Sequence, residues 1–247
     1  MARRTPAPRT RFTALRGLAI DEERLSRCAA WLGLPSVAGA DAGRRGHGST
    51  LALLDGPQGA EDSAAWLPPV AAWIEPTSAP DAQPTLTWQT ERAGSVDLYI
   101  NLTTETANDL HLAGRVLTAL AARHPLPPER RDDLELALHE AISNALVHGN
   151  LEVAGMKELS ATELERFSRD LVRQMANPVL AQRRLEVAVT LEPSALAVEV
   201  ADEGGGFQPN RTECHGASGR GLDLIATVAD SVELKDGGRR IRMRFSL

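Results

Sequence analysis

Two segments near the end of the chain alternate apolar and polar residues so strictly that they fix much of the fold. "RLEVAVTL" and "ALAVEVAD" are separated only by "EPS", and "SVELKDGGRRIRMRFSL" contains a second such pair. A period of two places one face of each strand in the core. In the second pair, Ile241, Met243 and Phe245 are expected to point inward and the arginines outward. The sequence therefore predicts two antiparallel hairpins in a sheet with one buried face.

Helical periodicity precedes these hairpins. Residues 104–123 read as one helix, and "ELALHEAISNALVHGN", residues 135–150, as another that Gly149 can end. Ser160 and Glu163 form a capping-box pattern before a further helix, which Pro178 closes. We therefore expect an α+β fold from about residue 85. It would be a two-layer sandwich of a mixed, mainly antiparallel sheet with helices on one face.

The first part of the chain has a different character. All four tryptophans lie at or before residue 88, "DEERLSRCAAWLGL" reads as a helix, and "STLALLDG" reads as a strand ending at Asp55. "EPTSAPDAQP", residues 75–84, is typical of a linker. After it, "TLTWQT" and "VDLYINL" are predicted to pair as a hairpin around Ala93 and Gly94. These signals divide the chain into a segment 1–84, a small α/β module of unknown role, and a domain 85–247.

Composition excludes several classes of function. A net charge of −6 argues against the positively charged surface that binds nucleic acid. No apolar run approaches the roughly 18 residues of a membrane span, and the basic start leads into no apolar signal region, so a cytoplasmic location is expected. The only lysines are Lys157 and Lys235, so "GRRGHGST" lacks the lysine of a P-loop. "LALLDG" imitates a receiver domain but has no later lysine nearby, which leaves only a degenerate module.

Three short motifs carry the chemistry. Glu140 and Asn144 share one face of a helix beside its apolar stripe, where a carboxylate and an amide have no packing role. Asp202-x-Gly204-x-Gly206 follows a predicted strand and lets the backbone turn tightly next to a carboxylate. Gly219-x-Gly221 precedes a helix, whose free N–H groups can bind an anion such as a phosphate.

In this order and spacing, the three motifs resemble the N, G1 and G2 boxes of the GHKL ATPase superfamily. "HEAISNALVHGN", "VADEGGGFQP" and "GRGLDLIATVADSVEL" look most similar to the anti-sigma-factor serine/threonine kinases of that superfamily. The resemblance covers roughly residues 85–247 and implies a Bergerat-type ATP-binding fold.

The resemblance also implies roles for single residues and for two cofactors, ATP and Mg²⁺. Asn144 matches the magnesium ligand, Glu140 the general base, and Asp202 the carboxylate that reads the amino group of adenine. The loops around base and phosphates match four glycines, Gly204, Gly206, Gly219 and Gly221, with residues 207–218 as a short lid. Because this lid has no lysine, Arg211 or Arg220 would supply positive charge near the γ-phosphate.

The resemblance implies an enzyme, a serine/threonine kinase that phosphorylates an anti-anti-sigma-type protein partner and can sequester a sigma factor. Two alternatives stay open: a non-catalytic regulator whose ATP-bound state gates a protein interaction, and the catalytic part of a histidine kinase. The last is weakened because His111 lacks the pattern of a phospho-accepting helix. The kinase is favoured because a pure binding module has no need of Glu140. A homodimer is also left open.

Overall fold

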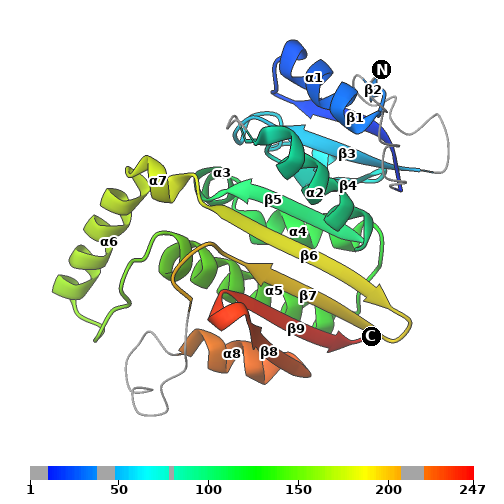
Figure 1. The fold of residues 1–247 in the computed structure, drawn as a ribbon. Helices are drawn as coiled ribbons and strands as arrows, with labels where there is room; N and C mark the ends of the chain where they lie inside the picture. The colour runs from blue at the N-terminus through cyan, green and yellow to red at the C-terminus, as the bar shows by residue number, and fades with distance from the viewer. Residues whose placement is uncertain (1–10, 38–47, 78–80, 207–219) are drawn as a thin grey trace.

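A computed structural model of the chain describes residues 11–37, 48–77, 81–206 and 220–247 (Figure 1). Its strands form one nine-stranded sheet in the order β2-β1-β3-β4-β5-β6-β7-β9-β8. The strands are β1 (Phe12–Leu18), β2 (Ser36–Val37), β3 (Ser49–Leu54), β4 (Val70–Ile74), β5 (Leu98–Thr103), β6 (Arg184–Glu192), β7 (Ala195–Ala201), β8 (Ser231–Lys235) and β9 (Arg240–Ser246).

The sheet has a parallel half and an antiparallel half that meet at β5. Strands β1 to β5 pair in parallel, whereas β5, β6, β7, β9 and β8 pair antiparallel. Both predicted hairpins are confirmed, β6 with β7 and β8 with β9. The predicted class, α+β with a mixed sheet, is confirmed as well.

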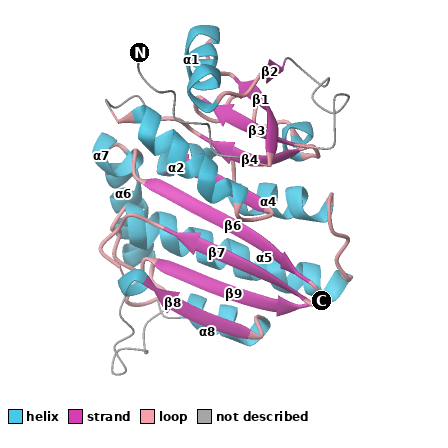
Figure 2. Cartoon of the chain, turned by 45° about the vertical axis from the view of Figure 1, so that its right-hand side comes forward, coloured by secondary structure: helices cyan, strands magenta, loops and turns pink. Residues whose placement is uncertain are grey.

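Helices cover the two faces of the sheet unequally. The α-helices are α1 (Glu22–Leu32), α2 (Ala82–Gly94), α3 (Thr104–Asp109), α4 (Leu112–Ala121), α5 (Pro128–Ser143), α6 (Ala161–Met175), α7 (Pro178–Ala181) and α8 (Arg220–Val228). Within the described ranges there are also short 3₁₀ turns, η2 (Ser63–Trp66) and η5 (Asp236–Gly238), and a π-helical segment, η3 (Asn144–Asn150). Figure 2 shows α2 in front of the sheet, with α4, α5 and α8 behind it. No helix within the described ranges is long and apolar enough to cross a membrane.

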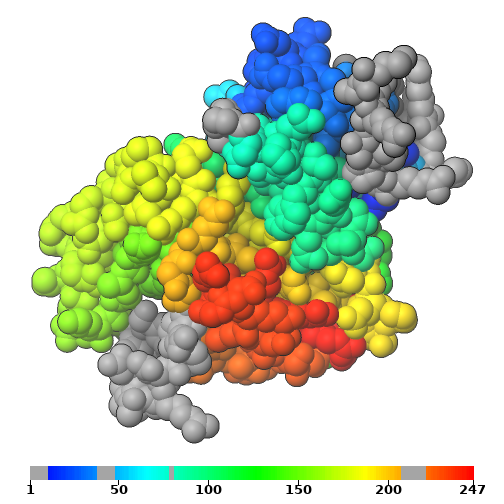
Figure 3. Space-filling model, viewed as in Figure 1, coloured from blue at the N-terminus to red at the C-terminus, as the bar shows by residue number. Residues whose placement is uncertain are grey.

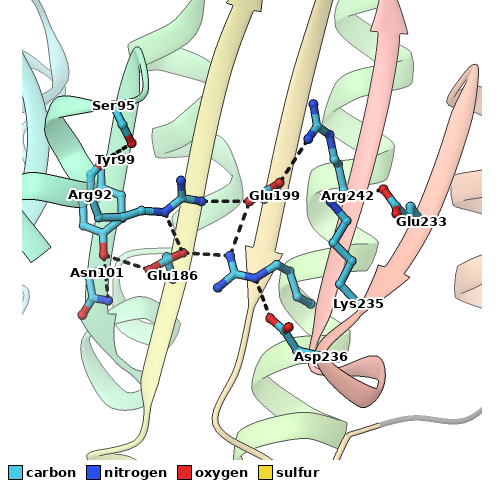
Figure 4. A network of polar contacts seen from close by, with 11 residues as sticks. Arg92, Ser95, Tyr99, Asn101, Glu186, Glu199, Glu233, Lys235, Asp236 and Arg242 are labelled. Atoms are coloured by element: carbon cyan, nitrogen blue, oxygen red, sulfur yellow. Dashed lines mark hydrogen bonds and ion pairs between the residues drawn. The ribbon is translucent and has the colours of Figure 1, made fainter. Parts of the chain in front are cut away.

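The alternation of β6, β7 and β9 separates a core face from a polar face. Val187, Val198 and Met243 are fully buried on the side of α5 and α8. The opposite face carries a ladder of arginines and glutamates (Figure 4), in which Arg92 of α2 reaches Glu199 at 2.9 Å. The prediction that the arginines of the last hairpin point away from the core is confirmed.

The predicted strand "TLTWQT" is wrong, because residues 82–94 form α2. Leu86, Gln89, Thr90 and Ala93 are its buried residues, at helical spacing. Two of the threonines that suggested a strand donate their hydroxyls to carbonyls one turn back, Thr87 to Gln83 at 2.9 Å and Thr90 to Leu86 at 2.8 Å. Tertiary packing therefore overrides their β-propensity. The predicted hairpin around Ala93 does not exist either.

The segment 75–84 is not the open linker that its composition predicts. Glu75 is buried at the end of β4, where it accepts hydrogen bonds from Thr103 and Thr106. Its last residues enter α2, where Pro84 is tolerated because the first turn needs no N–H donor. Residues 78–80 lie outside the described residues. The boundary drawn at residue 84 falls inside α2, and β4 pairs directly with β5 across it.

Two predicted helices are more broken than their periodicity suggests. The helix expected over 104–123 is α3 and α4, separated at His111, whose φ of 49° is left-handed. The helix expected over 135–150 begins as α5 and continues as η3 to Asn150, so Gly149 does not end it. α6 is confirmed with Ser160 as its N-cap, 3.3 Å from the Glu163 amide. The Glu163 carboxylate, however, accepts from the Lys157 amide instead of closing a capping box.

The first part of the chain contains the predicted helix and strand as α1 and β3. Asp21 caps α1 through the Arg24 amide at 2.8 Å. Trp66 and Trp73 stack with ring centroids 4.6 Å apart and belong to the same core cluster as the helices of the antiparallel half. This shared core joins the two halves of the sheet.

Candidate functional site

The first and third sequence motifs lie together between α5 and α8. Glu140 near the end of α5 and Asn144 at the start of η3 are both half-buried. Gly221 in the first turn of α8 faces them so closely that a Cβ there would lie 2.7 Å from Glu140 Oε2 and 3.1 Å from Asn144 Nδ2. A side chain at this position would displace the ends of the Glu140 and Asn144 side chains, so the carboxylate, the amide and a helix N-terminus converge here.

The second motif lies against the end of η3, the segment that begins with Asn144. Asp202 follows β7, and its amide donates to the Arg239 carbonyl at 2.9 Å. A Cβ at Gly149 would come within 2.5 Å of the Asp202 carboxyl carbon, and one at Gly204 within 2.2 Å of the Gly149 carbonyl oxygen. The two backbones approach so closely that neither position has room for a side chain.

Gly206 needs its glycine for a different reason. Its φ of +82° lies in the left-handed region, and a Cβ there would be 2.4 Å from the Gly237 carbonyl oxygen. The turn after β7 is therefore held between η3 on one side and the β8–β9 connection on the other. The predicted tight turn next to Asp202 is present.

The Asp202 carboxylate is partly desolvated. Burial raises its pKa above the ordinary aspartate value, although the Gly204 N–H and the charges of Arg239 and Arg183 act in the opposite direction. The Gly204 amide donates to Oδ1 at 2.8 Å. Within the described residues Oδ2 has no hydrogen-bond partner, so it can accept one from a ligand.

Other predicted residues fall outside this convergence. Gly219 and the lid 207–218 lie outside the described residues, and Arg220 is placed only as the first residue of α8. His148 is exposed, and its ring nitrogen Nδ1 lies 2.7 Å from the Val153 carbonyl. A carbonyl only accepts, so Nδ1 carries a proton and donates it there.

Sequence reasoning missed Asn150, the last residue of "HEAISNALVHGN". It is fully buried, and its Nδ2 donates to Thr104 Oγ1 at 2.9 Å and to the Arg184 carbonyl at 3.0 Å. Its Oδ1 accepts from the Glu203 amide at 2.8 Å. Asn150 thus fixes the residue next to Asp202. The sequence signal that could have identified Asn150 is an amide side chain at the very end of an apolar helix.

Arg184 connects this turn to the parallel half of the sheet. Its amide donates to Glu203 Oε2 at 2.8 Å, and its guanidinium donates to the side chain and carbonyl of Asn101 and to the Glu75 carbonyl. The turn that carries Asp202 is therefore hydrogen-bonded, through Arg184, to β4 and β5. Both halves of the sheet position the site.

Replacing Asn150 with aspartate should lower the free energy of unfolding by roughly 1–3 kcal/mol, because two buried N–H donors are lost. Urea denaturation measures this change. Asn108→Asp is the matched control, since Asn108 is exposed and, among the described residues, its side chain hydrogen-bonds only to the neighbouring Asp109. Equal stability of the two variants would contradict the anchoring role of Asn150.

One comparison with known proteins identifies a family. The family model described as "Histidine kinase-like ATPase domain" matches residues 103–245, from the last residue of β5 to β9. This range is more than half of the chain and contains all three motifs. The curated proteins include no match to the chain.

Proposed function

Because this chain belongs to the histidine kinase-like ATPase family, we propose that it binds Mg-ATP and transfers the γ-phosphoryl group to a serine or threonine of a protein partner. The observation that carries the proposal is the convergence of Glu140, Asn144 and Gly221 beside the turn of Asp202. The partner would be of the anti-anti-sigma type, by the resemblance to anti-sigma-factor kinases, and the regulated complex would include a sigma factor.

The turn after β7 suits an adenine base. A carboxylate only accepts hydrogen bonds, so Oδ2 of Asp202 pairs with the exocyclic amino group of adenine and repels the carbonyl of guanine. The absence of side chains at Gly149 and Gly204 keeps the backbone close around this carboxylate. The residues present therefore fit an adenine nucleotide.

The N-terminus of α8 suits the phosphates. α8 spans nine residues, and Gly221 lies in its first turn against Glu140 and Asn144. The first amides of a helix have no partner within the helix and attract anions. Bound ATP would supply the activated phosphoryl group, and Arg220 is in the sequence position to add positive charge.

Asn144 suits a magnesium ion shared with the phosphates. The described residues contain no cluster of three or more metal-ligating side chains. Mg²⁺ commonly takes one or two protein ligands and completes its shell with water and phosphate oxygens. The amide oxygen of Asn144, one turn from Glu140, provides such a single ligand.

Glu140 would act as the general base. Its half-buried carboxylate lies against Gly221, at the phosphate end of the proposed site. There it can accept the proton of a serine or threonine hydroxyl as the oxygen attacks the γ-phosphorus. A regulator that only binds ATP would gain nothing from this placement.

The proposal is tested with purified protein, γ-labelled ATP and the proteins that co-purify with the chain. We expect magnesium-dependent transfer of label to a serine or threonine of one partner, mapped by mass spectrometry. ATP binding without transfer or hydrolysis would support the ATP-gated regulator instead. Transfer to a histidine would support the histidine-kinase alternative, and no ATP binding by calorimetry would overturn the whole proposal.

Asn144→Ala should make nucleotide binding insensitive to magnesium. The ratio of ATP affinities with and without Mg²⁺ should fall to about one, because the protein ligand to the ion is gone. Titration calorimetry in magnesium and in EDTA measures this ratio. Asn144→Asp, which keeps an oxygen ligand, is the control and should retain the dependence. A wild-type magnesium response in Asn144→Ala would make Asn144 a plain helix-face amide.

A further inference from the structure

Helix α6 packs on the domain through Phe167, Leu171 and Met175, and beside these residues it carries two apolar side chains that are mostly uncovered in the described part of the chain. Leu164 is 56% exposed and Val172 is 71% exposed, and none of the helix's residues is buried. The two side chains are eight residues apart, so they lie on one face with Ser168 between them. Figure 3 shows this helix, coloured yellow-green, at the outer edge of the molecule, where another protein can reach it.

A groove extends this face toward α3. Its volume is about 340 Å³, and Leu171, Val172, Met175, Ala176 and Asn108 line it. Leu159, just before the helix, is 78% exposed. An apolar helix face with an adjoining groove is a common site for a second helix.

The sequence of α6 is complementary to itself in the antiparallel direction. With a twofold axis at Ser168, Leu164 of one copy lies opposite Val172 of the other. The small Ser168 side chains meet at the axis and allow close approach. A twofold interface requires this reciprocity, because each contact occurs twice.

The charges beside the apolar face follow the same symmetry. Glu165 and Arg169 are both exposed, and in the described part of the chain neither has an ion-pair or hydrogen-bond partner. The other charged pairs along α6 are already satisfied within the helix, as Arg166 is with Glu163 and Asp170. In the antiparallel pair, Glu165 of each copy lies about 3 Å along the helix axis from Arg169 of the other copy, on the same side of the interface. These two contacts between opposite charges flank one contact between the two Arg169 side chains.

We propose that the exposed face of α6, defined by Leu164, Glu165, Ser168, Arg169 and Val172, binds the same face of a second copy of this chain in an antiparallel pair. A single helix pair buries less than the roughly 1,200 Å² of a standard stable interface. The dimer is therefore weak and concentration-dependent. It does not depend on the ATP site, and its tests need no nucleotide.

Cysteine crosslinking tests the twofold axis. In a Cys214→Ser background, Ser168→Cys should form a disulfide dimer on mild oxidation, because the two residues face each other across the axis. Thr162→Cys is the matched control, since its copies would lie about 18 Å apart along the helices and cannot be bridged. Buried Cys28 is present in both variants. Equal crosslinking of the two variants, or none at position 168, would overturn the proposal.

Charge reversal tests the direction of pairing. Glu165→Arg alone and Arg169→Glu alone should each dimerise more weakly than the wild type in sedimentation experiments. Mixed together, the two variants should form a heterodimer roughly tenfold tighter than either homodimer, because every contact then joins opposite charges. The double variant, with both charges exchanged, should recover wild-type dimerisation. A dimer that is insensitive to all these changes would place the interface elsewhere on the chain. A protein that stays monomeric at every concentration would show that α6 does not bind a second copy. Either result overturns the proposal.

Discussion

Glu140→Gln is expected to bind Mg-ATP about as tightly as the wild type and to transfer its phosphoryl group about 10²–10⁴-fold more slowly. A general base acts only in the transfer step, so its removal spares ground-state binding. Glutamine keeps the shape that packs against Gly221 but cannot accept the hydroxyl proton. Single-turnover transfer of labelled phosphate, beside calorimetry on the same sample, separates the two effects.

Glu129→Gln is the matched control for this experiment. Glu129 lies in the first turn of the same helix, is exposed, and is far along the helix from Gly221. Its replacement should change neither binding nor transfer. If Glu140→Gln transferred phosphate at the wild-type rate, Glu140 would not be the base. If it lost ATP binding instead, the carboxylate would have a role in the ground state.

Asp202→Asn should weaken ATP binding by roughly 1–3 kcal/mol, the cost of a mispaired buried polar group. The Gly204 amide will hold the asparagine oxygen, as it now holds Oδ1, which turns the NH₂ group toward the base. That NH₂ group cannot accept a hydrogen bond from the amino group of adenine, but it can donate one to the carbonyl of guanine. The wild type should therefore prefer ATP to GTP, and the variant should lose most of this preference. Calorimetry with both nucleotides decides, and equal wild-type affinities would exclude the adenine-reading role.

The same substitution should raise the thermal stability of the free protein at neutral pH. Burial raises the Asp202 pKa in the folded state, so folding favours the protonated form. The contribution of the Asp202 carboxyl to the stability of the fold is most favourable below the ordinary aspartate pKa of 3.8. It is lost as the pH rises through the pKa of the folded state. At neutral pH the charged form carries this penalty, which the neutral asparagine removes. Weaker ATP binding together with higher stability would identify Asp202 as a functional residue retained at a cost to the fold.

The antiparallel half was predictable because each of its signals is local. A period of two along β6, β7 and β9 fixes which side chains are buried, and short turns fix the pairing. The spacing of Glu140 and Asn144 on one helix face was equally readable. That Gly221 would pack against both of them could be inferred only through the family resemblance, because the contact joins residues 77 to 81 positions apart.

The parallel half could not be read in the same way. Parallel strands are buried on both faces, so β3 and β4 show continuous apolar runs without a period. Threonines and a tryptophan gave α2 the composition of a strand, and only packing against β5 shows its helical period. Asn150 was missed because its partners, the Glu203 amide and Thr104, are brought to it by the fold alone.

The π-helical segment Asn144–Asn150 fixes how many residues separate Asn144 from Gly149 and Asn150. Its wider turns are marked by the Leu151 amide, which donates to the carbonyl five residues back, at Leu146. Each α-helical residue turns the chain by about 100°, so one residue fewer here would rotate all that follows by that angle. Gly149 would leave the Asp202 carboxylate and Asn150 would leave the Glu203 amide, while Glu140 and Asn144 stayed in place. The length of this segment is thus as closely constrained as the identity of its residues, and a single deletion would separate the magnesium and adenine parts of the proposed site without removing either.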